Sequence, residues 1–154
     1  MRTINEIIIH CTATRPDQDF HAADIDRWHK ANGWGGIGYH FVIDLDGTIE
    51  NGRPVERCGV HCAGHNANTI GIVYVGGVVG KGKNKKPADT RTKAQILSMH
   101  HLVTELMWRF PFIDKVSGHN EYSNKACPCF DVPKEFDYLC PVLGDDDWRD
   151  ELMW

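Results

Sequence analysis

The sequence contains no long apolar run. Near its start only Ile7–Ile9 stand in a row, too few for the apolar segment of a signal peptide and far too few for a membrane span. We therefore expect synthesis in the cytoplasm without a signal peptide, and no membrane span. Repeats and low-complexity segments are missing as well. A chain of 154 residues with 42% hydrophobic residues fits one globular domain.

The sequence also has little net charge. The chain has 17 lysines and arginines against 21 aspartates and glutamates, and most of the net charge of -4 lies in the last ten residues. A nearly neutral body argues against a dedicated nucleic-acid binder. We expect a folded domain over residues 1–136 and an acidic tail over residues 137–154.

Cysteines are present, but an export signal that would favour a disulfide framework is not. We therefore expect the six cysteines to be mainly thiols, with one of them a candidate metal ligand. Cys58 and Cys62 flank His61 and are close enough to pair if a turn allows it. A local disulfide after export remains an alternative for these two residues.

Runs of β-branched residues and turn signals predict the strands. They are expected at residues 6–10, 39–44, 48–50, 69–76 and 113–117. The turn signal Asp46-Gly47 joins the second and third of these into a hairpin. In a regular strand the adjacent residues Tyr39 and His40 face opposite sides, so at most one of them points into a given site.

Two helices are predicted. The first covers residues 21–32, with Asp19 as a candidate N-cap, Gly33 as a stop and Trp28 in the core. The second starts at the capping-box pair Thr92 and Gln95, has an apolar stripe and ends before Pro111.

A lysine-rich loop precedes the second helix and extends from Lys81 to Arg91. We expect a solvated loop; the alternative is a contact with an anionic polymer.

His10 lies at the carboxyl end of the first predicted strand. In sheets flanked by helices, ligands gather outside the carboxyl ends of the strands, so a residue able to bind a metal at this position is a site candidate. The alternative is a strand-end histidine bonded to the backbone. The strand predicted at residues 113–117 would deliver His119 to the same edge.

The stretch from Gly118 to Val132 has the most site-like composition in the chain. His119, Lys125, Cys127 and Cys129 stand among turn-forming residues, so a loop is expected to carry them. Imidazole and thiolate are ligands that zinc prefers, and a nearby lysine favours the deprotonated thiol. The alternative is that both cysteines are small buried hydrophobes and that His119 caps a turn.

Four segments together resemble a known family. In order along residues 5 to 132 they read IIIHCTAT, GYHFVIDLDGTIENGR, HCAGHNANTIGIVYVGG and GHNEYSNKACPCFDV. This combination is similar to the zinc-dependent N-acetylmuramoyl-L-alanine amidases of the phage lysozyme type, whose fold animal peptidoglycan recognition proteins share. The resemblance implies a single α/β domain with a mixed central sheet flanked by helices, and it makes residues 1–136 the zinc amidase domain.

The resemblance also implies the residues of the site. The zinc (Zn2+) ligands would be His10, His119 and Cys127, with a fourth position left open, as catalytic zinc needs. Tyr39 and Lys125 would be the catalytic pair. His61 falls at a family position near the substrate groove. Cys129 is expected to point away from the metal in an extended segment, and so to be structural.

The implied reaction is hydrolysis of the amide that joins the lactyl group of N-acetylmuramic acid to L-alanine in peptidoglycan. No glutamate stands beside the ligands as it does in the helix motif of metalloproteases. Proton transfer is therefore left open between Tyr39, a histidine such as His61, and the water itself. An enzyme without an export signal would reach the wall after release or cell lysis.

Two other functions are compatible with the resemblance. One is a non-catalytic peptidoglycan-binding recognition module, although such proteins are expected to lack the cysteine ligand, and Cys127 is present here. The other is a regulatory protein, because related phage lysozymes inhibit a viral RNA polymerase. For that role the sequence offers family analogy alone.

Overall fold

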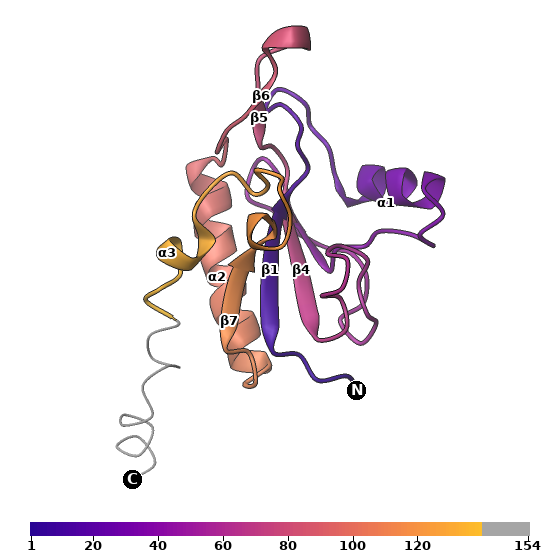
Figure 1. The fold of residues 1–154 in the computed structure, drawn as a ribbon, viewed down its shortest axis with the longest axis vertical. Coiled ribbons are helices and arrows are strands. Elements are labelled where there is room, and N and C mark those ends of the chain that lie inside the picture. Colours follow the sequence, from indigo (N-terminus) through magenta and orange to yellow (C-terminus); the bar gives the residue numbers. More distant parts are fainter. Residues whose placement is uncertain (140–154) are drawn as a thin grey trace.

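The structure is a computed structural model that describes residues 1–139. Five strands form a mixed sheet in the order β3-β2-β4-β1-β7, in which β2 and β3 are antiparallel and the other neighbours are parallel. Figure 1 shows β7, β1 and β4 side by side. The strands are β1 (Glu6–Cys11), β2 (Phe41–Ile43), β3 (Ile49–Asn51), β4 (Thr69–Tyr74) and β7 (Lys115–Gly118). The helices are α1 (Ala22–Ala31), α2 (Lys93–Arg109) and α3 (Val132–Glu135). The predicted fold class is confirmed.

β1 lies inside the sheet, between β4 and β7, and its side chains alternate between two covered faces. Ile7 and Ile9 belong to the core cluster that α2 covers, together with Met99 and Leu106. His10 therefore projects to the other face, because successive residues of a strand point in opposite directions. The run of isoleucines without alternation is explained by burial on both faces.

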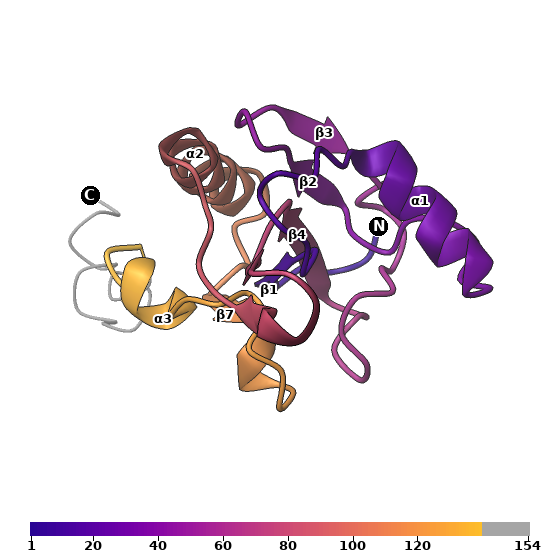
Figure 2. The same cartoon turned by 90° about the horizontal axis from the view of Figure 1, so that it is seen from above.

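The second face of the sheet is covered only in part. α1 packs there through Ile25, which joins Ile37, Val42 and Val73 in a separate cluster. Figure 2 shows α1 and α2 on opposite sides of the sheet. Loops border the remainder of this face of the sheet, beside His10. We call the side on which α1 packs the α1 face.

The hairpin and the second helix were predicted well, whereas several boundaries were not. β2 begins at Phe41 and β4 ends at Tyr74, so both strands are shorter than predicted. The N-cap of α1 is His21 and not Asp19. Trp28 is not in the core: it is 36% exposed and stacks edge-on against Phe20.

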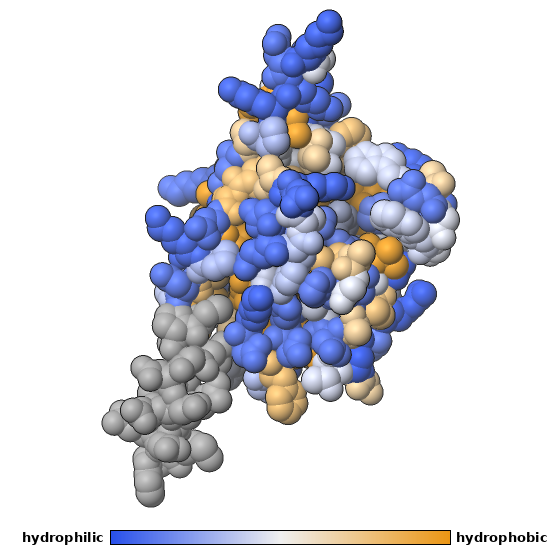
Figure 3. Space-filling view, viewed as in Figure 1, coloured by the Kyte–Doolittle hydropathy of each residue, from blue (hydrophilic) through white to orange (hydrophobic). Residues whose placement is uncertain are grey.

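The predicted basic loop is a small protruding hairpin of β5 (Val78–Val79) and β6 (Lys86–Pro87). Figure 3 shows hydrophilic side chains gathered over this protrusion, and its lysines are exposed. Arg91 does not belong to that surface, because its side chain is only 2% exposed and pairs with Asp89 and Glu135.

Within residues 1–139, no helix combines the length and the apolar character that a membrane crossing requires. The five cysteines of this part of the chain, Cys58 and Cys62 included, are free thiols. Most of the predicted acidic tail lies outside the described residues.

Candidate active site

Three metal-capable side chains from distant parts of the chain converge beside the carboxyl end of β1. His10 is the buried residue before the last position of that strand, His119 follows β7, and Cys127 lies in the loop beyond. β7 pairs with β1 so that Gly118 lies opposite Ile9, which places the next residue of each strand side by side. One donor atom from each of His10, His119 and Cys127 lies within 4.8 Å of the other two.

The hydrogen bonds around His10 determine which ring nitrogen is free. The hydroxyl of Thr69 has one proton, which it donates to the carbonyl oxygen of His65 at 2.6 Å. It must therefore accept from Nε2 of His61 at 3.1 Å, which leaves Nδ1 of His61 to accept from Nε2 of His10 at 2.9 Å. The lone pair of neutral His10 is then on Nδ1, the nitrogen available to a metal.

Burial keeps the two candidate imidazole ligands neutral. His10 is 1% exposed, and desolvation together with the neighbouring His61 and His119 holds its pKa well below the usual value of 6.5. The pKa of half-buried His119 is lowered by desolvation and by the charge of Lys125. A neutral imidazole is the form that binds a metal.

The surroundings of Cys127 lower the pKa of its thiol. A hydrogen bond from the thiol of Cys11 is the main cause that lowers the pKa of Cys127, and burial opposes it. The backbone N–H of Cys11 also donates to the Cys127 sulfur at 3.1 Å, and Lys125 adds a smaller electrostatic contribution. Sequence reasoning missed Cys11, although it directly follows His10, because its partner lies 116 residues away.

Tyr39, His61 and Lys125 surround the same point. The Tyr39 and His61 rings lie 5.1 and 5.0 Å from the His10 ring, measured between centroids. These residues line a groove with Lys125, His119 and exposed Trp34, and its floor continues to Cys62 and Asn66. The structure thus brings together all six residues that the resemblance identified.

The geometry narrows the choice of a proton acceptor. Burial raises the pKa of Tyr39, so its phenol is neutral and suited to donate a hydrogen bond. Burial lowers the pKa of His61 to about 3, and both of its ring nitrogens are already engaged. Neither group is a strong base in this arrangement.

Tyr39 and His40 do not alternate as a regular strand would require. Both precede β2, and both rings approach that of His61, with centroids 6.5 and 5.9 Å away. The ring of His40 is nonetheless held by the backbone, since Nδ1 accepts from the N–H of Gly71 and Nε2 donates to the carbonyl of Arg57. Of this pair, only Tyr39 lines the groove.

Cys129, two residues after Cys127, is not one of the converging donors. Its φ is 72°, so the segment turns there and is not extended as expected. Its thiol donates to the carbonyl oxygen of Gly77 at 3.4 Å. The three donor atoms that converge come from His10, His119 and Cys127.

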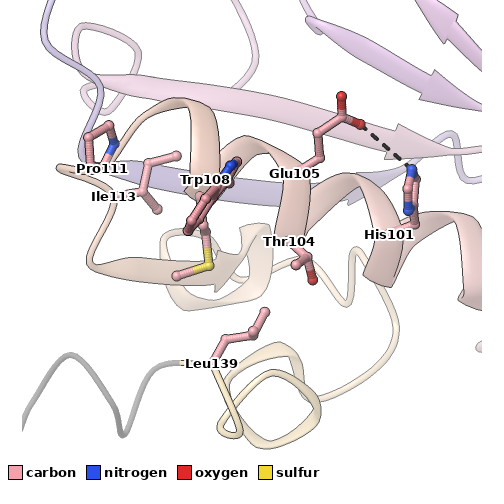
Figure 4. Close-up of a pocket in the computed structure, with 8 residues that line it drawn as sticks. His101, Thr104, Glu105, Trp108, Pro111, Ile113 and Leu139 are labelled. Atoms are coloured by element: carbon pink, nitrogen blue, oxygen red, sulfur yellow. Dashed lines mark ion pairs between the residues drawn. The ribbon is translucent and has the colours of Figure 1, made fainter. Parts of the chain in front are cut away.

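A second pocket has a different chemistry. It lies on the side of α2 and is lined mainly by apolar groups around Trp108, with the ion pair His101–Glu105 at its end (Figure 4). Cys127 and the histidines of the groove are not among the residues that line it. We therefore place the candidate chemistry in the groove.

The donor set fits zinc. Two neutral imidazoles and one thiolate form a common ligand set for a catalytic zinc, which keeps a fourth position open. Tetrahedral zinc with bonds of about 2.0–2.3 Å separates its ligand atoms by roughly 3.3–3.7 Å. The three donor atoms, all within 4.8 Å of one another, are compatible with a site of this size.

Comparison with known proteins identifies relatives over most of the chain. The family described as N-acetylmuramoyl-L-alanine amidase matches residues 1–130. The endolysin of Escherichia phage T7 is 40% identical over 128 residues, which cover 83% of this chain and 82% of that protein.

Solved structures agree with these matches. The N-acetylmuramoyl-L-alanine amidase LysC from Clostridium intestinale is 32% identical with a TM-score of 0.72, covering 87% of this chain and 82% of that one. A variant of Drosophila PGRP-LB, solved in complex with tracheal cytotoxin, has a TM-score of 0.70 at 23% identity, covering 88% and 81%. The second likeness concerns the fold alone.

Proposed function

Because the chain belongs to the N-acetylmuramoyl-L-alanine amidase family, we propose that the groove at the carboxyl end of β1 is its zinc-dependent active centre. The chain is an amidase that acts on peptidoglycan. The bond cleaved by this family joins N-acetylmuramic acid to L-alanine.

The observation that carries the proposal is the convergence of His10, His119 and Cys127 in forms suited to a metal. The environment of each side chain favours its metal-binding state, neutral for the imidazoles and ionised for the thiol. When bound there, zinc would act as a Lewis acid towards the substrate carbonyl and lower the pKa of water towards about 7.

The remaining groove residues supply charge and hydrogen bonds. Lys125 is exposed at the groove and offers a positive charge to the carbonyl oxygen as negative charge develops on it. Tyr39, with its raised pKa, donates a hydrogen bond. His61 holds His10 through its Nδ1, so we assign it the positioning of a ligand in addition to a place beside the substrate.

The ligand assignment is tested by a matched pair of cysteine variants. Cys127→Ser should lose most of the zinc, because it removes the only thiolate of the donor set, whereas Cys129→Ser should retain it at the same site. Elemental analysis after dialysis measures the difference. Equal zinc contents in the two variants would contradict the assignment.

The reaction is tested on its products. Mass spectrometry of digested peptidoglycan should find free stem peptides that begin with L-alanine, next to intact glycan chains. New reducing sugar ends without such amino termini would mean that the enzyme is a glycosidase, for which the site segments show no spaced pair of carboxylates.

The proposal includes the domain limits and the place of action. The amidase domain would span residues 1–136, which include α3 and extend slightly beyond the family match. Action on the cell wall would follow release of the protein from the cell that makes it. The relatives compared above are endolysins, amidases and recognition proteins, and a polymerase-binding role is not part of the proposal.

A further inference from the structure

A second cluster of metal-capable side chains lies beside β2, two strands away from His10 in the sheet. It joins His21, the N-cap of α1, to Asp44 and Glu50 of the β2–β3 hairpin. Both carboxylates lie on the same face of the hairpin as Val42, because Glu50 pairs with Val42 and Asp44 follows two residues later. β4 lies between β2, which Asp44 follows, and β1, which carries His10.

The distances within this cluster suit a shared cation. Nδ1 of His21 lies 3.1 Å from Oδ2 of Asp44 and 3.6 Å from Oε2 of Glu50. A tetrahedral metal bound at about 2.0–2.2 Å requires its ligand atoms to be roughly 3.3–3.6 Å apart. One donor atom of each residue lies within 4.8 Å of the other two, so little movement is needed.

Asp44 provides an independent indication of a missing partner. Its side chain is only 6% exposed, yet it points into the cluster, where Oδ2 contacts His21. Its other oxygen, Oδ1, is buried without a hydrogen-bond partner, and no other side-chain atom in residues 1–139 is in that state. Leaving a buried carboxylate oxygen unpaired is unfavourable, because the oxygen loses its hydration without gaining a partner, so native proteins rarely leave one.

The two carboxylates of the cluster share one basic partner. Within residues 1–139 the ion pairs of Asp44 and Glu50 involve only His21, and no lysine or arginine reaches either carboxylate. Two neighbouring carboxylates that share a single histidine as their ionic partner can be neutralised by a divalent cation.

The ring of His21 is oriented in the way that is typical of a metal-binding histidine. Nε2 of His21 lies 3.3 Å from Oδ1 of Asp19, on the opposite side of the ring from the two carboxylates. Metal-binding histidines almost always donate the second ring N–H to a carboxylate or carbonyl, which fixes the tautomer and leaves the other nitrogen free. His21 is 46% exposed, so solvent and metal can reach the cluster.

We propose that His21, Asp44 and Glu50 form a second zinc site, oriented by Asp19 and separate from the active centre. Zinc is the cation that the donor set favours, because imidazole with two carboxylates suits it better than magnesium or calcium, which prefer oxygen ligands alone. The fourth position is left to water. The bound ion would join the start of α1 to the hairpin that carries Tyr39 into the groove.

Zinc titration by calorimetry of the metal-free full-length chain tests this proposal. The Cys127→Ser background is used to reduce binding at the active centre, and His21→Gln and Asp44→Asn are each added to it. We expect about one equivalent of zinc in the background and a loss of that equivalent in both double variants. Asp19→Asn, added in the same way, should weaken binding by about 10–100-fold.

The control is His101→Gln in the same background, because His101 is an exposed histidine beside a single carboxylate, Glu105 at 3.7 Å. This control variant should still bind about one equivalent of zinc. Zinc should also raise the thermal midpoint of the background and the control but not of the His21 and Asp44 variants. If all the variants bind zinc as the background does, or if the background binds none, the cluster is a metal-free ion-pair network and the proposal is wrong. Every double variant is compared with the Cys127→Ser background. The effect of changing His21 or Asp44 can therefore be measured even if the active-centre assignment is wrong.

Discussion

At the scale of single residues, protonation decides what the groove can do. The chain of hydrogen bonds from Thr69 through His61 determines which nitrogen of His10 carries its proton. Thr69 is the first residue of β4, and neither of the two hydrogen bonds of its hydroxyl reaches a candidate metal ligand. Its role follows from having only one proton to donate.

Replacing Lys125 or Tyr39 should separate chemistry from metal retention. Lys125→Ala and Tyr39→Phe remove groups that are not among the three converging donors, so both variants should keep zinc and bind muropeptide almost as before. The loss should appear in kcat and kcat/KM together, because the interactions form in the transition state. About 2.7–4 kcal/mol per lost donor corresponds to roughly a hundred- to thousandfold in rate.

Steady-state kinetics with zinc occupancy measured in the same samples provides the comparison. Full activity of zinc-loaded Lys125→Ala would remove this lysine from the catalytic groups and leave it a surface role beside Cys127.

At the scale of elements, a buried arginine attaches α3 to the rest of the domain. Arg91 lies 3.4 Å above the Phe130 ring and binds both carboxylate oxygens of Glu135 at 2.7 Å. His100 of α2 contacts the same carboxylate at 2.9 Å. The short helix α3 thus depends on a charge network in addition to its buried Val132 and Phe136.

Glu135→Gln should therefore destabilise the fold. The change removes the charge that balances Arg91 and leaves the buried guanidinium with Asp89 as its ionic partner. Hydrogen bonds to charged groups contribute about 1.5–3 kcal/mol, which is the expected decrease in the free energy of unfolding. Urea denaturation at neutral pH measures it.

Glu105→Gln is the matched control, because its partner His101 is exposed and lies on the same helix. Its effect should stay within about 0.5 kcal/mol. Equal effects of the two changes would mean that the Arg91 network contributes no more than a surface ion pair.

At the scale of the whole molecule, buried histidines make the fold sensitive to acid. His40 is 1% exposed, and its Nδ1 accepts the backbone N–H of Gly71, so a proton on that nitrogen would break the bond. Burial is the main cause that lowers the pKa of His40 to about 4. The unfolded chain, with a histidine pKa of about 6.5, binds this proton more readily.

The contribution of His40 to the free energy of unfolding of the metal-free protein should thus be constant above pH 6.5 and decrease as the pH falls from 6.5 towards 4. The sign follows because the unfolded state binds more protons in that range. For His40 alone the decrease amounts to roughly 3 kcal/mol, at about 1.4 kcal/mol per unit of pKa difference. Urea denaturation across this range measures the dependence, which should become shallower in His40→Gln. A pH dependence that is the same in the wild type and in His40→Gln would contradict the role of His40.

The sequence by itself determined much of this protein. The isoleucine run, the Asp46-Gly47 turn and the Thr92–Gln95 capping box are local signals, and each predicted its element because the information lies within a few residues. The resemblance to the amidase family also identified residues of the groove from the sequence alone.

Only the tertiary structure decided which side chains meet. The Cys11–Cys127 contact, the Thr69–His61–His10 chain and the His21–Asp44–Glu50 cluster each join segments that no local pattern relates. The exposure of Trp28 and the burial of Arg91 were predicted wrongly for the same reason. Burial, tautomer and pKa depend on neighbours brought close by the parallel pairing of β1 with β4 and β7, and that pairing is a property of the folded chain.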